Sequence, residues 1–356
     1  MRILIASDAW HPQVNGVVRA IDTTATHLRG FGHTVEIVGP DRFRSVPAPG
    51  YKEVRLAVTP GKDLARIIEG FRPEAIHVPV EGPIGLAARR YCRTRKIPFT
   101  TSFHTRFGDY FAKRVGAGVD VAYAVQRWFH RGGNAIMVQT KTLEEQLAER
   151  GFRNIRHWGR AVDTEHFRPM RDEPGFDADF LDLPRPIFLY LGRVSAEKNL
   201  PAFLDLDLPG SKVIVGDGPA RAALEKAYPD THFLGYRSGI DLSRHLSAAD
   251  VFVFPSKFET FGLVVLEALA CGTPVAAFPV PGPLDTVGGT PHAVLSDDLR
   301  TAALEALSID RAGCRAFATT FSWEQCTREF EAALIPIPPS VWALNEPQGV
   351  DVALTG

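Results

Sequence analysis

The strongest constraint on the fold is a pattern of short apolar runs that alternate with helix-like segments. Segments between these runs, such as 17–31, 63–70, 85–95 and 142–150, carry helical periodicity. Strands that alternate with helices predict a parallel sheet covered on both faces. In the first half, the expected strands are rich in Val, Ile and Phe and lie between Gly, Pro or Asp residues; they are 3–7, 34–38, 54–58, 75–78, 99–103 and 135–139.

The alternation is interrupted once and then resumes. Residues 163–185 are polar, carry three prolines and show no clear periodicity, which is typical of a linker between domains. A last helix is expected at 322–334. The second set of expected strands is 187–191, 212–215, 232–234, 251–254 and 275–278.

Length supports the same division, because one hydrophobic core rarely grows beyond about 250–300 residues and the chain has 356. We therefore expect an α/β protein of two doubly wound, Rossmann-like domains, 1–165 and 166–335, that face each other across a cleft. The tail, 336–356, is expected to be loose or to lie on the surface. Open α/β sheets bind ligands at the carboxyl ends of their strands, so the cleft is the expected site.

Composition narrows the class of protein. No run reaches the about 18 apolar residues of a membrane span, and the N-terminus turns polar at Ser7 and Asp8, too early for a secretory signal. The four cysteines match no zinc spacing and are expected to be buried, reduced thiols of a cytoplasmic protein.

Charge is divided unevenly along the chain. Residues 1–172 hold 27 Lys and Arg against 17 Asp and Glu, a net charge of +10, and the remainder holds 13 against 24, a net of −11. A basic first half favours an anionic partner, but a solvated surface without a partner explains it equally well.

Two carboxylates lie where the strand 251–254 ends and a helix begins. Glu259 falls in the loop, Gly262 allows close backbone approach, and the helix end behind it offers free amides to a phosphate or a sugar hydroxyl. Glu267 falls among apolar helix positions, where a carboxylate needs a polar partner. That partner is either a neighbouring arginine or a ribose diol.

Two further glycine-containing loops follow expected strands. In the first, Arg193 and Lys198 stand five residues apart and can reach one anionic group, although surface cations have the same appearance. In the second, 216–219 reads Gly-Asp-Gly-Pro and predicts a tight turn that carries Asp217 near the cleft.

The first half carries two candidates of its own. Asn15 and Gly16 suit a left-handed turn ahead of a helix whose N-terminus faces a second phosphate. His104 follows the strand 99–103, at the carboxyl edge where catalytic side chains gather.

Taken in order, these motifs resemble family 4 glycosyltransferases, which have the GT-B fold. Seven residues separate Glu259 from Glu267, as in the E-x7-E motif of that family. Three other motifs match the family in order: Gly192-Arg193 with Lys198, the 216–219 turn, and Ala161-Val162-Asp163 before Phe167-Arg168-Pro169. The resemblance covers residues 1–334.

The resemblance implies a role for each candidate. Arg193 and Lys198 would bind the donor diphosphate and stabilise the departing nucleoside diphosphate. Glu267 would hold the ribose, and His104 would lie near the reacting centre, where it assists orientation or leaving-group charge. Further donor-binding positions implied are Glu259 with Thr260, Phe261, Gly262 and Leu263 at the sugar, Gly16 near phosphate, Tyr236, Arg237 and Ser238 at the base, and Asp217 in its turn near the cleft.

The resemblance implies that anomeric configuration is retained and that electrostatic stabilisation replaces a metal, so we expect no metal and no cofactor besides the nucleotide-sugar co-substrate. The sequences 233–239 and 7–12 resemble diacylglycerol glycosyltransferases and sulfolipid synthases. That subgroup implies a UDP-sugar donor, a lipid acceptor such as diacylglycerol, and peripheral attachment to the anionic inner face of the cytoplasmic membrane. Residues 107–114 and 128–131 mix aromatic and cationic side chains, as interfacial segments do.

Three alternatives remain open at the level of sequence. The acceptor could be soluble or a polysaccharide, the chain could be a sugar-nucleotide epimerase of the GT-B fold, or it could bind nucleotide sugars without catalysis. No nucleic-acid partner is expected.

Overall fold

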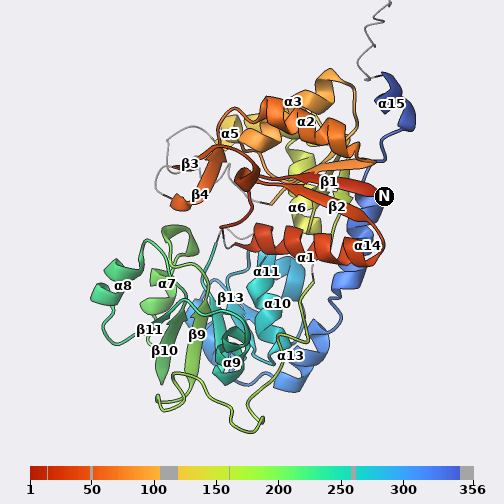
Figure 1. The fold of residues 1–356 in the computed structure, drawn as a ribbon. Coiled ribbons are helices and arrows are strands. Elements are labelled where there is room, and N and C mark those ends of the chain that lie inside the picture. Colours follow the sequence, from red (N-terminus) through yellow and green to blue (C-terminus); the bar gives the residue numbers. More distant parts are fainter. Residues whose placement is uncertain (14, 49–50, 105–118, 160, 258–261, 345–356) are drawn as a thin grey trace, which may run out of the picture.

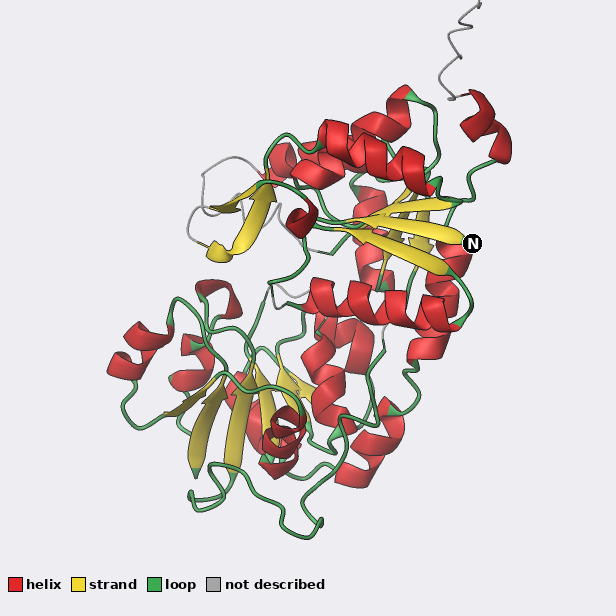
Figure 2. Ribbon diagram, viewed as in Figure 1, coloured by secondary structure: helices red, strands yellow, loops and turns green. Residues whose placement is uncertain are grey.

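The computed structural model describes residues 1–356 except 14, 49–50, 105–118, 160, 258–261 and 345–356. Its described part contains two six-stranded parallel sheets and one antiparallel hairpin (Figures 1 and 2). The strands of the first sheet are β1 (Arg2–Ala6), β2 (Thr34–Val38), β5 (Ala75–Val78), β6 (Thr100–Ser102), β7 (Ala135–Val138) and β8 (Ile155–His157). Those of the second are β9 (Ile187–Leu191), β10 (Ser211–Val215), β11 (His232–Gly235), β12 (Val251–Phe254), β13 (Val275–Ala277) and β14 (Ala293–Leu295).

Helices cover both faces of each sheet, as the alternating pattern predicts. Around the first sheet lie α1 (Gly16–Gly30), α2 (Gly61–Phe71), α3 (Pro83–Thr94), α5 (Val119–His130), α6 (Lys141–Glu149) and the short η1 (Pro40–Arg42). The second sheet carries η2 (Ala196–Lys198), α7 (Pro201–Leu204), α8 (Arg221–Ala227), α9 (Ile240–Ala248), α10 (Leu263–Ala270), α11 (Pro281–Val287), α12 (Leu299–Ala306) and α13 (Arg311–Ala318). The last helices are α14 (Trp323–Ala333) and α15 (Pro339–Leu344).

Strand order places a switch point in each sheet. The first sheet runs β2-β1-β5-β6-β7-β8, so the chain moves outward from β1 and then returns to the other side at β5. The second runs β11-β10-β9-β12-β13-β14 and reverses between β9 and β12. The crevice outside the carboxyl ends at such a reversal is the usual ligand site of doubly wound sheets. The expected α/β fold of two doubly wound sheets is confirmed.

One expected strand is placed differently. The segment 54–58 was expected within the alternating parallel set, but β4 (Tyr51–Ala57) pairs antiparallel with β3 (Ser45–Ala48) in a separate hairpin. Arg55 and Leu56 are only half-buried there, whereas every residue of β5 is buried. Strands at the centre of a parallel sheet are covered on both faces, and a segment that contains Arg55 does not suit that position.

The last helices pack against the first sheet although they follow the second in sequence. In α14, which begins after its N-cap Ser322, Cys326 and Phe330 are buried in one core cluster with Ile3 and Ile5 of β1. This packing differs from the expected grouping of residues up to 335 with the second domain. The chain crosses between the sheets twice, and apolar α14 positions complete the core beside α1.

Part of the tail is also anchored. Ile337 is buried in the cluster formed by β1, β5, α2 and α3, and Trp342 of α15 packs beside it. The Trp342 indole Nε1 donates a hydrogen bond to the Pro73 carbonyl over 3.1 Å. Residues 337–342 therefore lie fixed on the surface of the first domain, whereas the remainder, 345–356, falls outside the described residues.

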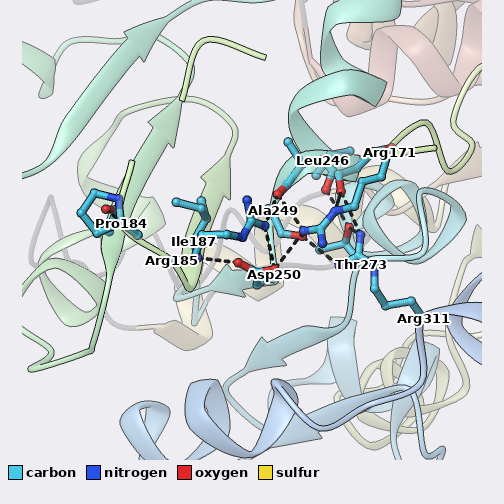
Figure 3. Close-up of polar contacts among 12 residues, drawn as sticks. Arg171, Pro184, Arg185, Ile187, Leu246, Ala249, Asp250, Thr273 and Arg311 are labelled. Atoms are coloured by element: carbon cyan, nitrogen blue, oxygen red, sulfur yellow. Dashed lines mark hydrogen bonds and ion pairs between the residues drawn. The ribbon is translucent and has the colours of Figure 1, made fainter. Parts of the chain in front are cut away.

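The linker is held to the second sheet by a carboxylate. Asp250 accepts hydrogen bonds from Arg171 Nη2 at 2.9 Å, Arg185 Nη2 at 2.7 Å and the Ile187 amide at 2.7 Å (Figure 3). Arg171 also donates to the last carbonyl groups of α9, and Arg311 does the same from α13. The cluster lies where β9 and β12 begin, at the edge of the sheet opposite the expected ligand site. The four cysteines are buried free thiols, as expected.

Candidate functional site

Four neighbouring strands of the second sheet carry the expected donor-binding residues on the loops at their carboxyl ends. Arg193 and Lys198 follow β9, Asp217 follows β10, and 236–238 follow β11. Gly262 and Leu263 come after β12, the neighbour of β9 at the switch point. Residues spread over about 70 positions of sequence are therefore brought to one edge of the sheet.

Glycines let these loops pack backbone against backbone. A Cβ at Gly216 would lie 1.9 Å from the Gly192 carbonyl oxygen, and one at Gly218 would lie 2.3 Å from the Val194 oxygen. Both glycines also have positive φ angles, which side-chain-bearing residues rarely adopt. The Val194 amide donates to the Asp217 carbonyl at 2.9 Å. The loop that carries Arg193 is thus fixed against the 216–219 turn, which pre-organises its position.

A second contact ties the β9 loop to the β12 loop. Asn199 has a left-handed φ of 54° and its Nδ2 donates to the Pro255 carbonyl at 3.1 Å. Gly262 is also left-handed, with φ 58°, and forms the N-cap of α10. Glu259, Thr260 and Phe261, which the sequence assigns to the sugar, lie outside the described residues.

Asp217 already has partners within its loop. One carboxylate oxygen accepts the Gly218 amide at 2.7 Å, and the other accepts Arg221 Nη1 at 3.1 Å. In this structure the side chain shapes the turn, and its expected contact with the donor stays a prediction.

The three residues expected at the base differ in exposure and pairing. The Tyr236 ring is 58% exposed, and a flat aromatic surface there can stack on a base. Arg237 instead forms an ion pair with Asp179 of the linker, through Nη2 and through Nε at 3.1 Å. Hydrogen bonds from Arg237 hold the pKa of Asp179 below its usual value. Ser238 follows in the same loop. The sequence had not indicated Asp179 as the partner of Arg237.

Glu267 is paired with a cation from the other domain. Its side chain is 3% exposed in the fifth position of α10, and Arg19 Nη1 from α1 lies 2.7 Å from Oε1. Figure 1 shows α1 between the first sheet and α10. Burial raises the pKa of Glu267, whereas the charge and hydrogen bond of Arg19 lower it. Of the two partners considered for this carboxylate, the structure shows the arginine.

A small cavity adjoins the ion pair. It measures about 100 Å³ and is bounded by α1, α10, α14 and the linker. Its lining includes Arg19, Glu267, His166, Phe167 and Trp323. Elements of both domains therefore meet at Glu267, together with the two segments in which the chain passes between the sheets.

In the first sheet, His104 lies in a chain of buried polar groups. Its Nε2 is 2.7 Å from Ser102 Oγ, which in turn is 3.1 Å from His77 Nε2. Gln139 Nε2 lies 3.1 Å from His104 Nδ1. Burial, aided by the charge of His130, lowers the pKa of His104 to about 4, so the ring is neutral near pH 7. A neutral ring with both nitrogens engaged orients neighbouring groups better than it supplies positive charge.

Two carboxylates at the first switch point were missed by the sequence analysis. Asp8 follows β1, and its oxygens accept the Ile84 and Gly85 amides at 3.0 Å each, which caps α3. Burial raises the pKa of Asp8 to about 6 against these hydrogen bonds. Glu81 follows β5, the neighbouring strand. The available signal was their position, directly after strands that flank a reversal of strand order.

The N-terminus of α1 is capped by its own chain. Asn15 has an extended backbone, φ −155° and ψ 169°, so the expected left-handed turn at this residue is wrong. Its side-chain oxygen accepts the amides of Val17 and Val18 at 3.0 Å each. These are donors that a phosphate at the helix end would use. The approach of donor phosphate to Gly16 stays a prediction.

The described residues contain neither a metal site nor a membrane-spanning helix. No group of three or more His, Cys, Asp or Glu side chains in this part of the chain is arranged to hold a metal ion. Within the same residues, no helix combines the length and apolar character needed to cross a membrane.

Comparison with known proteins identifies the family. Residues 14–166 match the family described as Glycosyltransferase Family 4, and residues 185–308 match Glycosyl transferases group 1. A GDP-mannose-dependent alpha-mannosyltransferase of Mycobacterium tuberculosis is 30% identical, over 82% of this chain and 82% of its own.

Two further relatives match most of this chain, and the name of the second includes diacylglycerol. The Sulfoquinovosyl transferase SQD2 of Arabidopsis thaliana is 28% identical over 74% of this chain and 56% of its own. An Alpha-monoglucosyldiacylglycerol synthase of Streptococcus pneumoniae is 27% identical over 78% of this chain and 71% of its own.

Among solved structures, Anabaena Alr3699/HepE in complex with UDP and glucose superposes with a TM-score of 0.68 at 14% identity, over 93% of this chain and 98% of that one. That likeness concerns the fold, which is GT-B, as expected. The chain belongs to the family 4 glycosyltransferases.

Proposed function

We propose that the chain transfers a hexosyl group from a UDP-sugar to a membrane lipid, diacylglycerol, with retention of anomeric configuration and without a metal. The observation that carries this proposal is the assembly of Arg193, Lys198 and the N-terminus of α10 at the switch point of the second sheet. Two cations and a helix end at one edge suit a diphosphate with an attached sugar.

The chemistry follows from this arrangement. The bond between the anomeric carbon and the diphosphate oxygen breaks while the acceptor hydroxyl oxygen bonds to the same carbon. The hydroxyl proton passes to the departing phosphate oxygen, on the same face of the sugar. Arg193 and Lys198 stabilise the negative charge that develops on the diphosphate, which supplies electrostatic catalysis from the protein alone. His104, neutral at pH 7, orients groups at the reacting centre.

The lipid acceptor is supported by the name of one relative and by a surface of the first domain. The relative is the alpha-monoglucosyldiacylglycerol synthase. On α5, Val121, Val125 and Trp128 are 60%, 59% and 53% exposed and share one face at helical spacing. An apolar stripe on a domain with net positive charge suits peripheral attachment to an anionic membrane, such as the inner face of the cytoplasmic membrane.

A guanosine donor is the second candidate. It is favoured by the GDP-mannose-dependent mannosyltransferase, which matches this chain over most of its length. Both donors present a diphosphate and a ribose, so Arg193 and Glu267 would serve either. The bases differ, and the loop that carries Tyr236 is where discrimination is expected.

Release of nucleoside diphosphate tests the reaction class. The purified chain is incubated with UDP-glucose, UDP-galactose, UDP-glucuronate or GDP-mannose, each without acceptor, with a soluble oligosaccharide, or with diacylglycerol in vesicles. We expect the vesicles to raise release well above the slow hydrolysis of donor alone, and release to be fastest with a UDP-sugar. Release that depends on the soluble oligosaccharide alone would contradict the lipid acceptor, and a donor epimerised without acceptor would indicate an epimerase.

Vesicle sedimentation tests the attachment. We expect salt-sensitive binding to vesicles that contain anionic lipid, and weaker binding for a Val121→Ser, Val125→Ser double variant. Removing each valine from the membrane costs about 1.5–3 kcal/mol of binding free energy, so the double variant should bind about 100-fold more weakly or worse. The matched control changes two exposed leucines of the second domain, Leu284→Ser and Leu307→Ser. Equal binding by both variants would rule out α5 as the contact.

A further inference from the structure

Glu81 occupies the reversal point of the first sheet. It follows β5, whose neighbours are β1 on one side and β6 on the other. Asp8 follows β1, and His104 follows β6, so three polar residues stand side by side at this carboxyl edge. Asp8 is committed to the N-terminus of α3, since both its oxygens accept amides there. Glu81, by contrast, does not cap a helix with both oxygens.

One oxygen of Glu81 is anchored and the other is not. Oε1 accepts Gln126 Nε2 at 3.2 Å and lies 3.3 Å from His130 Nε2, both side chains of α5. Within the described residues no other side chain donates to Glu81 and none reaches Oε2, although its own backbone amide also hydrogen-bonds to the carboxylate. The side chain is 26% exposed, so this oxygen remains within reach of a ligand. A carboxylate held on one side and open on the other has the form of a binding group.

The surroundings keep this carboxylate charged. Burial alone would raise the pKa of Glu81, but hydrogen bonds and charge from His130, together with Gln126, hold it below the usual value. His130 is itself positioned, because its Nδ1 lies 2.9 Å from Thr101 Oγ1 of β6. An anion repels a diphosphate and accepts a hydrogen bond strongly from a hydroxyl group. The chemistry therefore points to an alcohol and not to the nucleotide.

The helix that anchors Glu81 also carries the exposed apolar stripe. Gln126 and His130 lie on the buried side of α5, and Val121, Val125 and Trp128 lie on the exposed side. The two sides of one helix thus present a surface suited to a membrane and the anchors of a carboxylate suited to a hydroxyl group. Arg89 fixes this helix to α3 by donating to the Phe129 and Trp128 carbonyl groups at 3.0 and 2.9 Å.

We infer that Glu81 is an acceptor-binding residue, whose Oε2 accepts a hydrogen bond from the acceptor hydroxyl group while α5 holds Oε1. The inference rests on the proposed function for the identity of that acceptor, a lipid alcohol. In this role Glu81 orients the hydroxyl oxygen toward the anomeric carbon, and the proton still leaves to the donor phosphate.

The test compares Glu81→Gln with the wild-type chain in steady-state transfer. Glutamine keeps the shape and loses the charge, so we expect kcat/KM for the acceptor to fall by about 10- to 100-fold, the effect of one charge-assisted hydrogen bond. The KM for the donor and the slow hydrolysis of donor without acceptor should stay unchanged. Glu69→Gln, a surface carboxylate paired with Arg95, is the matched control.

Two outcomes would overturn the inference. Unchanged acceptor kinetics would show that Glu81 does not bind the acceptor, and an equal loss for donor and acceptor with a lowered melting temperature would show that it only ties α5 to the sheet. His130→Gln separates these roles further, because a loosened anchor should weaken acceptor binding and spare donor hydrolysis. If the wild type uses a water-soluble alcohol instead of diacylglycerol, the lipid assignment fails, and the same comparison on that alcohol still decides the role of Glu81.

Discussion

Arg19 Nη1 lies 2.7 Å from Glu267 Oε1, and the two residues belong to helices that pack on different sheets. The guanidinium also lies 5.7 Å from the centre of the Phe167 ring in the linker. The carboxylate that the family resemblance assigns to the ribose is therefore paired in this structure with a cation of the opposite domain. A ribose that binds Glu267 has to share this carboxylate with Arg19 or displace it.

Removing this cation should destabilise the fold in a pH-dependent way. Arg19→Ala leaves a buried carboxylate without its partner, which should cost about 1–3 kcal/mol of unfolding free energy at pH 7. The pKa of Glu267 is raised in the folded state, so the group takes up a proton as the pH falls and no longer needs a cation. Denaturant unfolding at pH 7 and pH 4 should therefore show a smaller loss at pH 4. Arg19→Lys is the control, and an equal loss at both pH values would contradict the account.

Arg193 and Lys198 should each be needed for turnover and not for folding. With Arg193→Ala or Lys198→Ala, we expect kcat to fall by about 10²- to 10³-fold, as when one donor to developing charge is removed. Melting temperatures should stay close to that of the wild type. Lys226→Ala, on α8 of the same domain, should turn over normally. Wild-type kcat in both site variants would show that the assigned diphosphate site is wrong.

His104 should stay neutral through the physiological range. Its pKa is lowered from 6.5 to about 4 by burial, and burial beside His104 lowers the pKa of His77 as well. Below pH 6.5 the unfolded chain binds protons that the folded chain does not bind. The free energy of unfolding should therefore fall between about pH 6.5 and pH 4, by up to about 3 kcal/mol for His104. The measurement is an NMR titration of the imidazole signals, assigned with His104→Asn. A His104 signal that titrates near 6.5 would contradict the burial described here.

Asp250 should anchor the linker electrostatically. Three donors hold its pKa below the usual value despite burial, so its contribution to stability is present above about pH 4 and is lost as the pH falls through the folded pKa. Asp250→Asn should lose about 2–3 kcal/mol at pH 7, and the difference from wild type should shrink in acid. Asp63→Asn, an exposed carboxylate, should change stability by less than about 0.5 kcal/mol. A constant difference across pH would mean that charge plays no part.

Much of the fold could be predicted from sequence because its period is so regular. The strands 187–191 and 75–78 are buried on both faces and read as continuous apolar runs, and the structure places them where expected. The edge strands β8 and β14 were missed because they are both short and partly exposed, whereas the equally short β6 and β13 are fully buried. The antiparallel pairing of β4 and the packing of α14 on the first sheet depend on contacts far along the chain, which no local pattern contains.

The candidate site, like the fold, could be predicted from the sequence only in part. Loops after strands are recognisable in sequence, so Arg193 and Asp217 could be named from the pattern, whereas Tyr236 was named from the family resemblance. Their partners could not, because Asp179 meets Arg237, and Arg19 meets Glu267, only after two separate segments fold together. Glu81 was overlooked for this reason, since its anchors lie 45 and 49 positions away.

The most direct test of the central claim is the mass of the lipid product. Vesicles that contain diacylglycerol and anionic lipid are incubated with the chain and the panel of nucleotide sugars, and the extracted lipids are analysed by mass spectrometry beside a reaction with Lys198→Ala. We expect a diacylglycerol species heavier by one sugar residue, formed with a UDP-sugar by the wild type and nearly absent with the variant. Sugar recovered only on water-soluble acceptors, with the lipid unchanged under every donor, would contradict it.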